Sequence, residues 1–182
     1  MHFCLIDRVL ERTPVDSANG QGPPVGASIV TLKLISMAEE YLLDHFPGFP
    51  VLPGVLMVEA MVHAARELVR PAQSVIEFQR PPLVLSRVRA VKYGAMMEPG
   101  TSLQVTVTFL GMNEDGSLEF KGEGIKLVPG LPAAVQSDEG SSLPAPLQVE
   151  AAKAAVSGKF TLRALKLPSF AGPARPVVAP VS

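Results

Sequence analysis

The feature that most constrains the fold of this chain is an apolar helix, expected over residues 53–70. Its apolar side chains point in every direction around the helix axis instead of forming one stripe; they are Val55, Leu56, Met57, Val58, Met61, Val62, Leu68 and Val69. A helix that leaves no side for water has to be wrapped by other structure. Pro53 suits the first turn, where its missing N–H costs nothing, and Pro71 ends the helical pattern.

The early turns of this helix carry a single charged side chain, Glu59. Apolar surroundings cannot replace the hydration of a carboxylate, so we expect its pKa to be raised. A carboxyl group that keeps its proton near neutral pH can act as a general acid. Fourteen residues earlier stands His45, whose imidazole can take up a proton in the same pH range. The two residues are a candidate acid and base.

A stiff loop connects this base to the helix. Three prolines between His45 and Gly54 favour extended backbone, and the glycines permit close approach. At the start of the helix, the N–H groups of Gly54 and Val55 form the positive end of the helix dipole, where they can stabilise a developing oxyanion. A base, an acid and oxyanion donors therefore lie within a short stretch of sequence.

The loop and helix together read HFPGFPVLPGVLMVEAM. This segment resembles the signature HFPGxPVxPGVLxxEAM of the FabZ-type 3-hydroxyacyl-(acyl-carrier-protein) dehydratases, which have the hot-dog fold. The resemblance implies that His45 and Glu59 are the catalytic residues, and that Gly54 binds the thioester carbonyl beside Pro53 and Val55. The related FabA-type isomerases have aspartate in place of the glutamate, so the chain is similar to the FabZ branch.

The resemblance also implies a reaction and its partners. A (3R)-3-hydroxyacyl thioester, carried on the phosphopantetheine of an acyl carrier protein, would lose water to give the trans-2-enoyl thioester, with no cofactor and no metal. The enzyme would be a homodimer whose sites combine residues of two subunits, with a trimer of dimers as a further assembly. Two alternatives stay open: a hot-dog acyl thioesterase, and an acyl-binding subunit without catalysis. A histidine base ahead of the helix favours elimination.

His63 stands where the family usually has glutamine, four residues after the glutamate and therefore on the same helix face. Three interpretations remain. His63 replaces the glutamine amide as a hydrogen-bonding group, or it lowers the pKa of Glu59 when protonated, or it joins Glu59 and His45 in a metal site.

The rest of the sequence predicts a long antiparallel sheet built from meanders around the helix, an α+β architecture. Strand patterns cover residues 3–10, 27–36, 87–97, 102–110, 117–127 and 157–165, and a helical turn is expected at 38–43. We expect one domain over residues 1–167. It is interrupted by a flexible insertion at 128–156, with a weak helical patch at 148–156, and is followed by a proline-rich tail at 168–182.

Charge and composition exclude several classes of protein. With 16 basic and 17 acidic residues the net charge is −1, which argues against a nucleic-acid-binding protein. A single cysteine, Cys4, cannot form an internal disulfide. The sequence shows neither a leader nor a long uncharged apolar run, so we expect a cytoplasmic protein with no membrane partner. Arg87, Arg89 and Lys92 are candidates for steering an acidic carrier protein, and the alternative is that these charges form only the solvated face of a strand.

Overall fold

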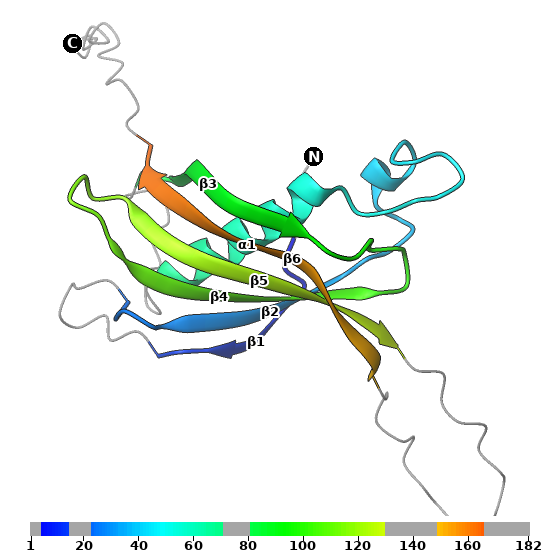
Figure 1. The fold of residues 1–182 in the computed structure, drawn as a ribbon, viewed down its shortest axis with the longest axis horizontal. Coiled ribbons are helices and arrows are strands. Elements are labelled where there is room, and N and C mark those ends of the chain that lie inside the picture. The colour runs from blue at the N-terminus through cyan, green and yellow to red at the C-terminus, as the bar shows by residue number, and fades with distance from the viewer. Residues whose placement is uncertain (1–4, 15–22, 71–80, 130–148, 166–182) are drawn as a thin grey trace, which may run out of the picture.

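The structure, a computed structural model, describes residues 5–14, 23–70, 81–129 and 149–165. These residues form a six-stranded antiparallel sheet and one long helix, α1 (Gly54–Val69), which lies across one face of the sheet (Figure 1). This is the α+β hot-dog arrangement that the sequence predicts.

The strand order across the sheet is β1-β2-β4-β5-β6-β3. The strands are β1 (Arg8–Arg12), β2 (Ser28–Leu34), β3 (Leu83–Tyr93), β4 (Ser102–Met112), β5 (Leu118–Pro129) and β6 (Val149–Ala164), and a short 3-10 helix, η2 (Glu40–Leu42), follows β2. Strands β4, β5 and β6 form a meander, as expected. Strand β3 does not join that meander in sequence order, because it pairs with β6 at the edge of the sheet.

The core lies between α1 and the sheet. Alternate residues of β4 face the helix and are buried, namely Leu103, Val105, Val107 and Phe109, as the period-two pattern predicts. Gly122 on β5 allows the helix to approach closely, since a Cβ at this position would lie 2.3 Å from Sδ of Met61. Each large apolar side chain buried here contributes about 1.5–3 kcal/mol.

The sheet does not cover α1 on every side. Val55 is 72% exposed, and the side chains of Glu59 and Arg66 are 34% and 36% exposed. The expectation that no side of this helix faces water is therefore wrong for the single chain, because the sheet and loops reach only part of its circumference. Pro53 precedes the helix as its N-cap, and Arg70 is extended, as expected for a residue before proline.

Several strand boundaries differ from those predicted. Strand β1 begins at Arg8, whereas Phe3 and Cys4 lie outside the described residues. Strand β3 covers Leu83–Tyr93 instead of 87–97, and the backbone leaves it at Gly94, where a Cβ would lie 2.4 Å from the Ala154 carbonyl oxygen.

The predicted insertion is shorter than expected, because β5 continues to Pro129 and β6 already begins at Val149. Residues 149–156 are strand, not a helical patch, since pairing with β5 outweighs the weak helix preference of an alanine-rich run. The rest of the insertion, 130–148, and the tail from 166 lie outside the described residues. A single domain over residues 1–167 stays a prediction.

Across the ranges that the structure describes, no helix has the length and apolar character needed to cross a membrane.

Candidate active site

The loop that carries His45 is held by backbone hydrogen bonds at both ends. The Val51 N–H donates to the His45 carbonyl oxygen over 2.9 Å, and the Leu52 N–H donates to the Met97 carbonyl oxygen over 2.8 Å. The imidazole stacks on Phe46, with ring centroids 4.3 Å apart. These contacts fix both the backbone and the ring plane of the histidine.

One nitrogen of the His45 ring has a defined partner, since Nδ1 lies 2.9 Å from the carbonyl oxygen of Val51. A carbonyl oxygen can only accept a hydrogen bond, so Nδ1 carries the hydrogen. In the neutral ring, Nε2 then keeps its lone pair and can accept a proton. The loop therefore selects the tautomer that a general base needs.

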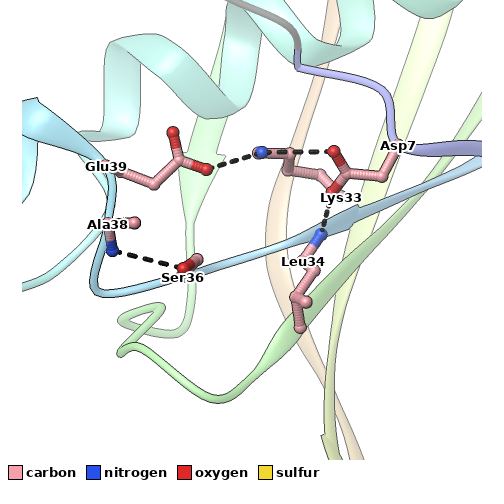
Figure 2. Close-up of polar contacts among 6 residues, drawn as sticks. All are labelled: Asp7, Lys33, Leu34, Ser36, Ala38 and Glu39. Carbon is pink, nitrogen blue, oxygen red and sulfur yellow. Dashed lines mark hydrogen bonds and ion pairs between the residues drawn. The ribbon is translucent and has the colours of Figure 1, made fainter.

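An ion network around the buried side chain of Lys33 ties the segment before this loop to the sheet (Figure 2). Nζ of Lys33, on β2, lies 2.7 Å from Oε1 of Glu39 and 3.4 Å from Oδ1 of Asp7, and the Lys33 side chain is only 6% exposed. Asp7 also accepts a hydrogen bond of 2.6 Å from the Leu34 N–H. Glu39 directly precedes η2, so this network anchors the chain on its way from β2 to His45.

The network shifts two pKa values. Burial lowers the pKa of Lys33, but the hydrogen bond to Glu39 and the charges of Asp7 and Glu39 outweigh burial, and the pKa lies above its ordinary value. Burial, together with the charges of Glu39 and Asp7, raises the pKa of Tyr41 to about 12. Lysine and tyrosine therefore keep their protons throughout the neutral pH range.

The helix start presents unpaired donors. The Pro53 carbonyl oxygen accepts the N–H groups of Leu56 and Met57 over 2.9 and 3.3 Å. The N–H groups of Gly54 and Val55 have no acceptor among the described residues, which leaves them available to an oxyanion. The ring of Tyr93, at the end of β3, lies against Gly54, where a Cβ would come within 2.9 Å of its Cε1.

Glu59 makes both of its described contacts through one oxygen. Oε1 lies 3.0 Å from Nη1 of Arg66 and 3.3 Å from Nε2 of His63. The hydrogen bond from His63 lowers the pKa of Glu59; burial opposes this, and the positive charge of Arg66 lowers the pKa further. The expected rise in pKa is therefore wrong for this chain, because two nitrogen groups on the same helix face outweigh the burial.

His63 lies where two of its three interpretations place it, within reach of the Glu59 carboxylate. The contact fits a replacement for the glutamine amide and also fits a group that lowers the Glu59 pKa. The metal interpretation lacks ligands in the described ranges, where no three His, Cys, Asp or Glu side chains lie close enough together to hold a metal ion.

The structure does not bring the two candidate catalytic groups into contact. Within the part of the chain described, His45 contacts Val51 and Phe46, whereas Glu59 contacts His63 and Arg66. Arg66 and Tyr93 are site residues that the sequence reasoning missed. The position of Arg66, two helix turns after Glu59, was a signal that could have identified it. No sequence pattern indicates the contact between Tyr93 and Gly54.

Comparisons with known proteins show the family to which this chain belongs. The ApeI-like family, described as ApeI dehydratase, matches residues 26–128, more than half of the chain. A 3-hydroxyacyl-(acyl-carrier-protein) dehydratase FabZ from Polaromonas sp. is 34% identical over 65% of this chain and 73% of its own length. A FabZ from Ruminiclostridium cellulolyticum is 31% identical over 66% of this chain and 83% of its own length.

Among solved structures, the fluoroacetyl-CoA thioesterase FlK is similar, with a TM-score of 0.53 and 14% identity, over 80% of this chain and 90% of that one. At this identity the likeness concerns the fold alone. The family match and the relatives show more: this chain belongs to the hot-dog dehydratases of the ApeI-like and FabZ type.

Proposed function

We propose that the chain removes water from (3R)-3-hydroxyacyl thioesters carried by an acyl carrier protein, giving trans-2-enoyl thioesters for fatty-acid or related acyl-chain synthesis. The observation that carries this proposal is the hydrogen bond between Nδ1 of His45 and the Val51 carbonyl, which leaves Nε2 as a proton acceptor. The relatives named FabZ support the same reaction.

In the proposed reaction, Nε2 of His45 takes the proton from C2 of the substrate. The electrons of the C2–H bond form the C2=C3 double bond as the bond between C3 and oxygen breaks, and Glu59 gives a proton to the departing hydroxyl, which leaves as water. The N–H groups of Gly54 and Val55, next to Pro53, stabilise negative charge on the thioester oxygen. His45 then returns a proton to solvent, and Glu59 is reprotonated.

We assign the site to a homodimer, in which each site takes His45 from one subunit and Glu59 from the other. Exposed apolar side chains on the loop, at the helix start, at the end of β3 and just after it support this assignment; they are Phe46, Phe49, Val55, Tyr93 and Met96. The Leu52–Met97 hydrogen bond joins these segments. Strand β3 is also an edge strand of the described sheet, and edge strands with open hydrogen-bonding groups favour pairing.

A complementation experiment tests the shared site. His45→Ala and Glu59→Gln chains, each inactive as a homodimer, should regain activity when they are unfolded together and refolded as a mixture, because the mixed dimer contains one complete site. If both residues came from one chain, every site in the mixture would still lack one group, and activity would stay absent.

We also propose that exposed basic residues on β3, Arg87, Arg89 and Lys92, steer the acidic carrier protein, and that the enzyme works in the cytoplasm beside that carrier. Lys159 on β6 lies opposite Arg89 and extends the positive surface. Arg89→Glu should lower kcat/KM at low salt more than at high salt. Arg8→Glu, on the opposite edge of the sheet, is the matched control and should leave kcat/KM unchanged.

Mass spectrometry of a 3-hydroxyacyl carrier-protein thioester, incubated with the protein, separates the candidate functions. Dehydration removes water and leaves the acyl group attached. A thioesterase would release the free acid, and an acyl-binding subunit would leave the thioester unchanged. Loss of water that disappears in His45→Ala and in Glu59→Gln supports the proposed roles.

A further inference from the structure

Three residues on one face of α1 form a chain of contacts that the proposed reaction does not yet use. Glu59, His63 and Arg66 follow each other at spacings of four and three residues, so their side chains share a helix face. His63 and Arg66 both contact Oε1 of Glu59. Within the described residues, Oε2 has no such contact. One oxygen of the carboxyl group is therefore held, while the other is left for a substrate.

Arg66 is itself held by a second element. Its Nε donates a hydrogen bond of 2.9 Å to the carbonyl oxygen of Leu83, the first residue of β3. The guanidinium group is planar and rigid, so the directions of its Nε and Nη1 donors are fixed relative to each other. The bond to β3 consequently sets the direction of the bond to Glu59. The orientation of the carboxyl group depends on the edge strand as well as on its own helix.

We propose that Arg66 is a positioning residue for the general acid: by bridging the Leu83 carbonyl and Oε1 of Glu59, it turns Oε2 toward the hydroxyl group that leaves the substrate. This inference rests on the proposed dehydration. It assigns His63 a place in the same arrangement, because Nε2 of His63 contacts the same oxygen and helps to hold it.

The contacts of Arg66 and His63 with Glu59 have a measurable consequence, because both residues change the charge around the carboxyl group. The groups that act on its carboxylate are His63 and Arg66, both on α1, and β3 contributes the Leu83 carbonyl that holds Arg66. A cation beside a carboxylate favours the ionised form. A general acid must be protonated to react. Arg66 therefore lowers the fraction of Glu59 that can donate a proton, while it fixes the orientation of the carboxyl group. Removing its charge should move the limb of the kcat profile that follows Glu59 to higher pH.

Two substitutions of Arg66 separate its charge from its geometry. Arg66→Gln removes both, and it should lower kcat roughly 10- to 100-fold with little change in KM while shifting the limb that follows Glu59 to higher pH. Arg66→Lys keeps the charge but cannot make both bonds, so it should lower kcat without that shift. Arg70→Gln, which removes another arginine near the end of the same helix, is the matched control and should behave as wild type.

A second readout does not depend on activity. Carbon-13 NMR of the Glu59 carboxyl group should give a higher pKa in Arg66→Gln than in the wild type. This titration stays informative even if the wild type removes no water, in which case the proposed function fails and the contact is still tested. A Glu59 pKa that is equal in both proteins, or an Arg66→Gln enzyme with wild-type kcat and an unmoved pH profile, would overturn the assignment of Arg66.

Discussion

The Nδ1 atom of His45 lies 2.9 Å from the carbonyl oxygen of Val51, six residues further along the same loop. Since Val51 in turn donates its N–H to the His45 carbonyl, the loop closes on itself and holds the imidazole, which also stacks on the Phe46 ring. The base is thus fixed by a loop that turns at residues 46–49, where the Phe49 N–H donates to the Phe46 carbonyl oxygen; the extended backbone expected from the prolines is wrong for this stretch.

This arrangement predicts how His45→Ala will behave. The substitution removes the only proposed base, so turnover should fall about 10²- to 10⁴-fold. The His45 side chain is not part of the buried core, so the unfolding midpoint in urea should barely change. Parallel kinetics and urea titrations of both proteins check this. A large loss of stability would assign the histidine a structural role instead.

The contact between Gly54 and Tyr93 predicts a coupling between two substitutions. In Gly54→Ala the new methyl group would lie 2.9 Å from Cε1 of Tyr93, so the ring must move and the melting temperature should fall. Tyr93→Ala empties that space, and the double variant Gly54→Ala/Tyr93→Ala should therefore be no less stable than Tyr93→Ala alone. Thermal unfolding of the three variants measures the coupling. Additive effects would mean that the two residues act independently.

The ion network around Lys33 predicts a stability difference between two lysine substitutions. Lys33→Met leaves Glu39 and Asp7, whose side chains are 25% and 40% exposed, without their shared cation, and the free energy of unfolding should fall by about 1–2 kcal/mol. The matched control is Lys121→Met, which removes an exposed ion pair, with Nζ of Lys121 2.7 Å from Oε1 of Glu123. This substitution should lower the free energy of unfolding by less than about 1 kcal/mol. Equal losses in urea unfolding would contradict a special role for the ion network around Lys33.

Stability should also depend on acid pH. The hydrogen bond from Lys126 holds the pKa of Glu98 below its ordinary value, against the effect of burial, and the pKa of Glu59 is lowered as well. A depressed pKa in the folded state adds stability that is fully present above the ordinary value. That stability disappears as the pH falls through the lower, folded value.

The free energy of unfolding should consequently decrease as the pH is lowered below about 4.5, and Glu98→Gln should reduce the slope of this decrease. Urea titrations at a series of pH values measure both slopes. The prediction would be wrong if Glu98→Gln and the wild type lost stability in parallel.

Much of the fold could be predicted from the sequence because its signals are local. The alternation in residues 102–110 and the turn NEDG determine β4 and β5, and Pro71 places the helix end within one residue. The position of β3 beside β6, and the early start of β6, depend on pairing between distant strands, which no local pattern reveals.

The pKa of Glu59 likewise depends on contacts that the local sequence pattern does not reveal. The apolar neighbours of Glu59 in sequence suggested a raised pKa, but the pKa depends on which side chains reach the carboxylate. His63 and Arg66 do so from the same helix face, and the direction of the shift is reversed. The candidate residues of the motif can be identified from their spacing in the sequence. The role of Arg66 can be identified only in the structure, from its hydrogen bond to the Leu83 carbonyl oxygen.

The proposed reaction depends on His45, which removes the C2 proton of a carrier-bound 3-hydroxyacyl thioester. Mass spectrometry of that thioester after incubation with wild-type and His45→Ala protein tests this claim. The wild type should convert the substrate to the enoyl thioester, with loss of water, and His45→Ala should leave it intact. Release of free acid by the wild type, or equal loss of water with both proteins, would contradict the claim.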